Sequence, residues 1–271
     1  FYKRIIAIDS TNFSVYKQLS NMVESNEGIV FAAPYLAKAN RLNPTDGEIA
    51  YDFSRVLKAT KQNKLAEDVL DAALVADSSN LILLRGKAEI AYASERWPVV
   101  IRICEKILQE GDSTAQVVKM LGESYFFSRN YTRSIELLQS LEKKSMENES
   151  ILYFLAMSFK GLKNQGKAIE YLYKTIEEGI SPNIADYYSH IGDSFEKRKM
   201  AKKALAAYQK SLQFEVKPMT YYAIANIYDQ QLKNSASALR YFRKYLAAKP
   251  PLKEQKLYIE FSASRVKELS R

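Results

Sequence analysis

The sequence is poor in the residues that catalytic and metal sites use most often. It holds 1 histidine and 1 cysteine, His190 and Cys104, in 271 residues. A zinc site needs three or four ligands held together, so a His/Cys metal site is excluded. No glycine-rich loop of the phosphate-binding kind is present. We therefore expect no enzyme, no catalytic residue, no metal and no cofactor, and we interpret Cys104, next to Ile103, as a core residue.

Glycine and proline are also scarce, at 9 and 7 residues, while 47% of the chain is hydrophobic. Such a composition is too apolar for disorder and too poor in turn residues for a many-stranded sandwich. No apolar run approaches the ~18 residues of a membrane-spanning helix, and no signal peptide is visible. Because Phe1 opens inside a helical pattern, we expect a segment to precede it. Cytoplasm and bacterial periplasm both stay open as compartments.

What the chain does contain is a repeat. The pattern Leu121-Gly122-x-x-Tyr125 returns as Ile191-Gly192-x-x-Phe195 and in further copies, each followed by a polar stretch and an Ala-rich run. The repeats start at positions 13, 47, 81, 115, 149, 185 and 218, in steps of 34, 34, 34, 34, 36 and 33 residues. A fixed period of this length indicates stacked supersecondary units.

A slot is a position within the repeat, counted from the first residue of each repeat. Two slots hold small residues, as two closely packed helices require. Slot 8 holds Ser20, Ser54, Ala88, Gly122, Ala156, Gly192 and Ala225. Slot 20 holds Ala32, Ala66, Val100, Ser134, Ala168 and Ala204, and in the last repeat the corresponding small residue, Ala238, stands one position later. Larger apolar residues three or four positions away complete an amphipathic helix pattern. Each repeat is therefore predicted to be a pair of antiparallel helices.

These slots resemble the tetratricopeptide repeat, whose Leu-Gly-x-x-Tyr, Ala, Phe, Ala, Pro pattern recurs every ~34 residues. The resemblance implies an all-α fold, a right-handed solenoid of stacked antiparallel helix pairs. Residues 1–12 match the second helix of a preceding repeat, residues 13–251 form seven repeats, and residues 252–271 form a capping helix. Without a break in composition, we expect one continuous body.

The resemblance further implies a concave groove lined by slots 2, 5, 9 and 12 of the first helices. Aromatic side chains interleaved with charges are typical of peptide-binding hot spots, and a solvated helix face with scattered tyrosines is the alternative. The candidate groove residues are Lys17, Asn21, Tyr51, Arg55, Arg85, Glu89, Tyr92, Lys119, Glu123, Tyr153, Met157, Tyr222 and Asn226.

Lys17 and Asn21 resemble the Lys-x-x-x-Asn that opens the carboxylate clamp of chaperone-binding family members. The rest of that clamp is missing, because Asp52, Ile82 and Gly86 stand where Asn, Lys and Arg belong. Recognition of a chaperone's C-terminal carboxylate is therefore not expected.

The positive charge is concentrated near the C-terminal end. Residues 1–184 carry 23 basic and 23 acidic residues, whereas residues 185–271 carry 17 and 8. The basic flank comprises Lys197, Arg198, Lys199, Lys202, Lys203, Arg240, Arg243 and Lys244. It could meet an acidic protein, nucleic acid or an anionic membrane, or it could simply be a solvated surface. Nucleic acid is disfavoured because no recognised binding module accompanies the charge.

We therefore predict a protein-interaction scaffold that binds an extended peptide or a partner helix, of unknown identity, in the groove. The alternative is a structural subunit of a larger assembly, an envelope assembly included, that docks through the basic flank. A regulatory arm fused to an effector domain is a third interpretation.

Overall fold

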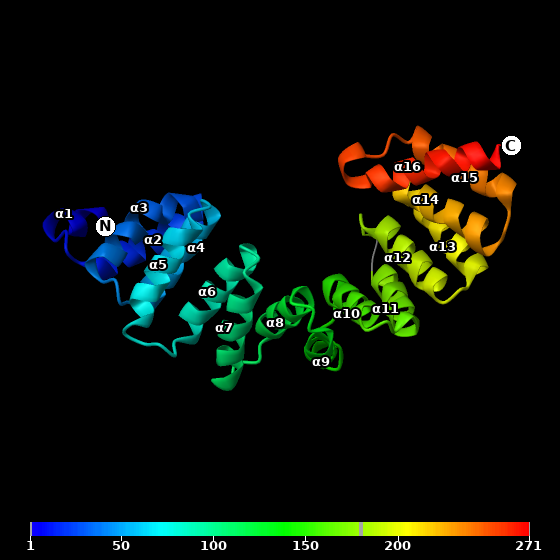
Figure 1. The fold of residues 1–271 in the computed structure, drawn as a ribbon. Coiled ribbons are helices and arrows are strands. Elements are labelled where there is room, and N and C mark those ends of the chain that lie inside the picture. The colour runs from blue at the N-terminus through cyan, green and yellow to red at the C-terminus, as the bar shows by residue number, and fades with distance from the viewer. Residues whose placement is uncertain (1, 179–180, 271) are drawn as a thin grey trace. The chain divides into compact units, whose positions relative to one another are not determined.

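The computed structural model describes residues 2–178 and 181–270, which form helices and turns and no strand. Within these described ranges, seven first helices alternate with seven second helices (Figure 1). The first helices are α2 (Phe13–Glu27), α4 (Gly47–Ala59), α6 (Leu81–Ala93), α8 (Ala115–Phe127), α10 (Glu149–Gly161), α12 (Ile184–Lys197) and α14 (Pro218–Asn226). The second helices are α3 (Ile29–Leu42), α5 (Asn63–Leu74), α7 (Trp97–Gln109), α9 (Tyr131–Glu142), α11 (Gln165–Glu177), α13 (Ala201–Phe214) and α15 (Ser235–Ala247).

A short helix and a long helix flank these pairs. Helix α1 (Tyr2–Ile8) precedes them, and α16 (Leu252–Leu269) follows them with one kink at Gln255. A π-helical turn, η1 (Ile227–Gln231), continues α14. The all-α prediction is thus confirmed. The chain divides into two compact units, Phe1–Leu137 and Leu138–Arg271, at a boundary inside α9 where the sequence shows no break in composition.

Local sequence sets where the first helices begin. Asn12, Asp46 and Asn148 each accept a hydrogen bond from the backbone N–H three residues later, at 2.9–3.2 Å. A side-chain oxygen that satisfies a free N–H of the first turn is the usual N-cap of a helix. In these three helices the polar residue before the apolar run therefore marks the start of the helix.

In six of the helix pairs, the turn between the two helices has a similar backbone conformation. A residue other than glycine takes a positive φ at Lys61, Glu95, Arg129, Lys163, Lys199 and Lys233. In five of these pairs the next N–H donates to the carbonyl five residues back, as from Gln62 to Leu57 at 2.8 Å and from Asn164 to Phe159 at 2.9 Å; after Lys233 the N–H of Asn234 donates to Tyr228, six residues back, at 2.8 Å. The bond to the carbonyl five residues back is that of a Schellman C-cap. It reverses the chain at the same place in each pair.

The small residues of slots 8 and 20 lie at the helix contacts, and all fourteen are buried. Gly192 shows why they must be small, because a Cβ atom built there would lie 2.7 Å from the Tyr208 ring. Cys104 is fully buried, and burial raises the pKa of its thiol to about 12. The thiol is therefore protonated and packs as an apolar group, as expected.

Candidate functional site

The polar side chains of the first helices in the N-terminal unit contact the next first helix. Arg55 of α4 binds Glu24 of α2 at 3.1 Å, and Lys58 of α4 binds Glu89 of α6 at 2.6 Å. The hydroxyl of Tyr92 on α6 donates to the carboxylate of Glu123 on α8. Each contact joins slot 12 of one repeat to slot 9 of the next, and we call these contacts rungs. In the first two rungs opposite charges neutralise one another, and all three join neighbouring first helices.

Further bonds accompany these rungs. Lys17 of α2 pairs with Glu48 of α4, and Arg85 of α6 pairs with the buried Asp112 at 2.7 Å. Lys119 lies 3.8 Å from Glu123. Most of the charged residues expected to attract a partner in this unit are therefore already paired within the chain.

The first-helix surface of the N-terminal unit contains a hollow of about 340 Å³ beside the last of these rungs. Its walls come from α4, α6 and α8 and include Lys58, Glu89, Tyr92, Gln116 and Lys119. Gln116 donates to Glu89 at 2.9 Å. Burial and the neighbouring Glu123 raise the pKa of Tyr92, so its hydroxyl stays a hydrogen-bond donor.

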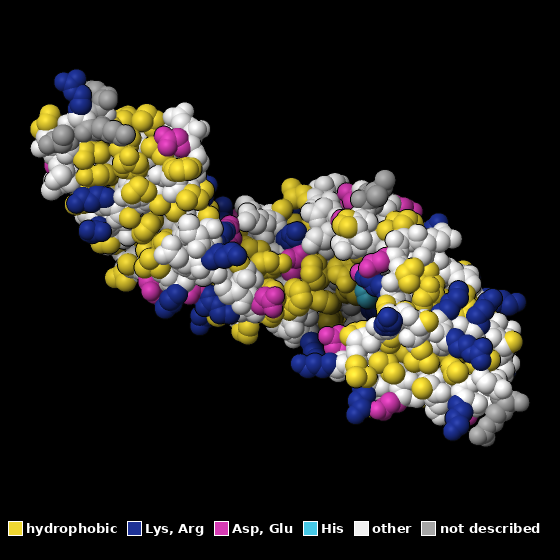
Figure 2. Space-filling view, turned by 90° about the horizontal axis from the view of Figure 1, so that it is seen from above, with side chains coloured by type: hydrophobic (Ala, Val, Ile, Leu, Met, Phe, Trp, Pro, Cys, Tyr) yellow, Lys and Arg dark blue, Asp and Glu magenta, His cyan; other side chains and the backbone are white. Residues whose placement is uncertain are grey.

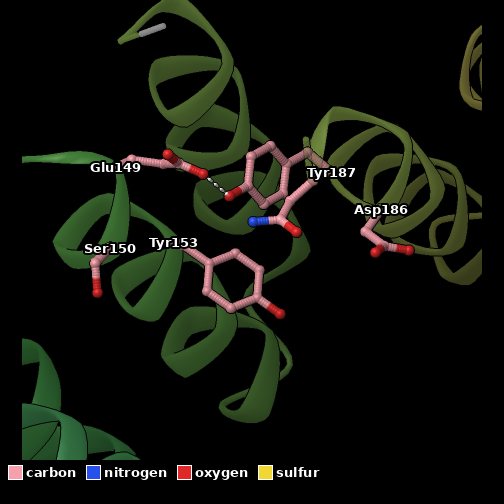
Figure 3. Close-up of a pocket in the computed structure, with 6 residues that line it drawn as sticks. Glu149, Ser150, Tyr153, Asp186 and Tyr187 are labelled. Carbon is pink, nitrogen blue, oxygen red and sulfur yellow. Dashed lines mark hydrogen bonds between the residues drawn. The ribbon is translucent and has the colours of Figure 1, made fainter. Parts of the chain in front are cut away.

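The C-terminal unit has a hollow of about 390 Å³ at the starts of α10 and α12 (Figure 3). It is lined by Glu149, Ser150, Tyr153, Asn183, Asp186 and Tyr187. The rings of Tyr153 and Tyr187 have centroids 5.5 Å apart. The hydroxyl of Tyr187 donates to Glu149, as the dashed line in the figure shows. Two aromatic walls and two carboxylates therefore share one small space.

Hydrogen bonds fix the charge of this hollow. The hydroxyls of Ser181 and Tyr187 both donate to Oε1 of Glu149, which lowers the pKa of that carboxyl. Asp186 accepts two hydrogen bonds from Lys217, both 2.7 Å. Burial and the charge of Asp186 raise the pKa of Tyr153, whose hydroxyl makes no hydrogen bond in the described part of the chain. It is a protonated donor open to a ligand.

A half-buried histidine, His190, lies beside this hollow, its ring centroid 6.2 Å from that of Tyr153. Lys160 of α10 forms the rung to Asp193 of α12 at 2.7 Å, and its ammonium group lies 3.2 Å from Nδ1 of His190. Burial, then the charge of Lys160, lowers the pKa of His190 to about 4. The imidazole is therefore neutral at physiological pH, with Nδ1 as acceptor for the lysine.

This histidine predicts a pH dependence of stability. Its pKa is about 4 in the folded chain and about 6.5 when unfolded, so between these values the unfolded chain binds the extra proton. Stability is therefore nearly full above pH ~6.5 and falls as the pH drops toward 4, by about 2 kcal/mol at pH 5. Urea unfolding at pH 7 and pH 5 measures the loss. The variant His190→Gln should lose less, and an equal loss would contradict this origin.

The structure corrects part of the expected groove. Met157 and Glu123 are buried, so their side chains are not open to a partner as expected. Tyr51 packs against Gly86, where a Cβ atom would lie 3.1 Å from its ring. The ring of Tyr222 is 4.9 Å from that of Tyr258 on α16. These side chains are used in packing between neighbouring helices.

The other expected residues are at least partly accessible. Asn21 is exposed, and the rest are half-buried: Lys17, Arg55, Arg85, Glu89, Tyr92, Lys119, Tyr153 and Asn226. All eight residues of the basic flank are exposed: Lys197, Arg198, Lys199, Lys202, Lys203, Arg240, Arg243 and Lys244.

Sequence reasoning missed several lining residues of the two hollows. Glu149 and Tyr187 occupy slots 1 and 3, and Asn183 precedes its helix. None of the three stands at slot 2, 5, 9 or 12, the slots predicted to line the groove. The sequence does carry one signal of them. The step from 149 to 185 is 36 residues rather than 34, which marks an irregular connection ahead of α12.

Within residues 2–178 and 181–270, no helix combines the length and the apolar character needed to cross a membrane. Across the same residues, no group of three or more His, Cys, Asp or Glu side chains is arranged to hold a metal ion.

Comparison with known proteins relates the chain to repeat proteins. The family model "Tetratricopeptide repeat" matches residues 220–251. A comparison with curated proteins returns no significant match. The crystal structure of YrrB, described as a TPR protein with an unusual peptide-binding site, has a TM-score of 0.61 at 19% identity, covering 68% of this chain and 94% of YrrB.

Two more solved structures share the fold. A tetratricopeptide repeat protein from Parabacteroides merdae has a TM-score of 0.60 at 15% identity, covering 96% of this chain and 99% of its own. The MamA protein has a TM-score of 0.56 at 21% identity, covering 62% of this chain and 91% of its own. At these identities the likeness concerns the fold.

Proposed function

We propose that this chain, whose residues 220–251 match the tetratricopeptide repeat and whose fold is that of tetratricopeptide repeat structures, is a non-catalytic scaffold that binds an extended peptide or a partner helix through its first helices. One observation carries the proposal. Each unit has a hollow whose walls come from first helices and the residues just before them. Clefts of several hundred Å³ with a few convergent polar groups are the usual form of binding sites.

The chemistry of the C-terminal hollow suits a peptide main chain. Such a chain offers both N–H donors and carbonyl acceptors. Asn183 has an amide that can both donate and accept, Tyr153 offers its hydroxyl, and Glu149 is a fixed acceptor. The rings of Tyr153 and Tyr187 supply apolar walls for a side chain.

The rungs support the same proposal in a different way. Because they tie neighbouring first helices together, the binding surface is ordered before a partner arrives. A preorganised surface loses less conformational entropy on binding, so more of the contact energy appears as affinity. YrrB provides a precedent for a peptide-binding site on this fold.

The test uses residues that line the hollows without forming rungs. A random peptide library is selected on the chain, and the enriched peptides are measured against Tyr153→Ala and, separately, Gln116→Ala. We expect at least one variant to weaken binding about tenfold, the effect of losing one hot-spot contact. The matched control, Gln209→Ala, changes an exposed residue of the second helix α13.

The outcomes separate clearly. Wild-type melting temperatures for all three variants would show that loss of binding reflects the surface. If selected peptides bind both hollow variants as tightly as wild type, or are lost with Gln209→Ala alone, the first-helix proposal is wrong.

A further inference from the structure

Helices α13 and α15 carry positive charge without any acidic residue. Their cations are Lys202, Lys203, Lys210, Arg240, Arg243 and Lys244. None of these six forms an ion pair with a carboxylate in the described part of the chain, and all are exposed. Arg243 instead donates to the hydroxyl of Ser270 at 3.2 Å. These six residues form what we call the basic face.

Neighbouring acidic residues are already engaged elsewhere. Asp186 binds Lys217, Asp193 binds Lys160 and Lys197, and Asp229 binds Arg265. The positive charge of this region is therefore not neutralised from within. Figure 2 shows several groups of Lys and Arg on the part of the surface formed by the C-terminal unit, with few acidic side chains between them.

Aromatic rings contact four of the six cations of the basic face. The ammonium group of Lys203 lies 5.7 Å from the centroid of Phe195, and that of Lys210 lies 5.4 Å from Phe214. On α15, the guanidinium group of Arg240 and the ammonium group of Lys244 lie 5.1 and 5.2 Å from the Tyr241 ring. Such cation–π contacts reduce the freedom of long side chains. A partner then meets charges that are already positioned.

We propose that the basic face is a second interaction surface, separate from the first helices, and that it binds an acidic polypeptide segment. Arg240 and Lys244 are one helical turn apart on α15, about 6 Å along its axis. Alternate side chains of an extended chain are about 6.8 Å apart. Alternating carboxylates can therefore reach successive cations. The exposed Ala206, Gln209 and Ala236 leave room for a chain to lie close to the surface.

Other anionic partners fit the surface less well. Adsorption to a membrane is strengthened by apolar side chains that enter the lipid. On the described residues of α13 and α15 the one large exposed apolar side chain is Phe214, which stacks on Tyr188 at 5.8 Å. Single-stranded nucleic acid uses open aromatic rings, whereas Tyr241 is buried beneath its two cations.

Fluorescence anisotropy tests the proposal with a labelled peptide of alternating glutamate and serine, about ten residues long. We expect saturable binding that weakens as salt rises and that falls at least tenfold in the variant Lys203→Gln, Lys210→Gln, Arg240→Gln, Lys244→Gln. The control variant Arg102→Gln, Lys143→Gln, Lys144→Gln, Lys253→Gln removes the same charges at exposed positions elsewhere and should bind like wild type.

A charge-retaining variant distinguishes loss of charge from loss of folding. The variant Lys203→Arg, Lys210→Arg, Arg240→Lys, Lys244→Arg should bind the peptide like wild type. Equal losses in the basic-face and control variants would overturn the proposal, because binding would then follow net charge alone. Absence of binding, or tighter binding to phosphatidylserine vesicles or a single-stranded oligonucleotide than to the peptide, would also overturn it.

Discussion

Replacing Arg265 with alanine is expected to destabilise the C-terminal unit by about 3 kcal/mol, because it leaves a buried carboxylate without its cationic partner. Nη2 of Arg265 on α16 binds Oδ1 of Asp229 at 2.6 Å, and Nε binds Oδ2 at 3.0 Å. The side chain of Asp229 is only 5% exposed. Urea unfolding measures the loss, and hydrogen exchange should show the amides of α16 opening first.

A matched control distinguishes this pair from an ordinary surface contact. Lys256 and Glu260 also pair on α16, at 3.8 Å, but both side chains are more than half exposed. Lys256→Ala should therefore change stability by no more than about 0.5 kcal/mol. Equal effects of the two substitutions would contradict the role assigned to Arg265.

The second large effect is expected for Gly192→Ala. Alanine favours a helix by about 1 kcal/mol over glycine, yet the new methyl group would lie 2.7–2.9 Å from three atoms of the Tyr208 ring. The ring is buried and must shift, so we expect a net loss of about 2 kcal/mol. The change in the urea midpoint at constant slope measures it.

Substitutions of two other glycines serve as comparisons for Gly192→Ala. Gly166→Ala introduces a methyl group whose nearest neighbour is 3.7 Å away, so the helix preference should make it neutral or slightly stabilising. At Gly86 the nearest ring atom of Tyr51 would be 3.1 Å away, and an intermediate effect is expected. If Gly192→Ala stabilised the chain as Gly166→Ala does, close helix packing at slot 8 would not limit residue size.

The fold was predictable because its strongest constraint is local and repeats along the chain. Small residues such as Ala66 and Ala168 recur where two helices touch, and the period of about 34 residues brings them into line. Lys87 stands at a position of the repeat that is otherwise apolar. Its ammonium group forms an ion pair with Asp71 of α5. The division into seven repeats stays a proposal, supported by first helices that begin at Phe13, Gly47 and Leu81.

The candidate site was harder to predict because a surface position depends on the neighbouring repeat. The slot pattern places Arg55 and Glu89 on the groove, but it does not reveal that Glu24 and Lys58 already bind them. Met157 is buried because α10 has apolar residues on nearly every side, including Leu152 and Phe159. A pattern read within one helix does not contain this information.

The rungs of the N-terminal unit also make its repeats non-interchangeable. Their polarity reverses from step to step, since Glu24 meets Arg55 and then Lys58 meets Glu89. Removing residues 47–80 would bring Glu24 opposite Glu89, two like charges, whereas removing residues 81–114 would bring Lys58 opposite Glu123, two opposite charges. Loss of the third repeat is thus electrostatically permitted and loss of the second is opposed. The charges of the rungs therefore favour one order of the repeats, which limits which repeats can be deleted or exchanged.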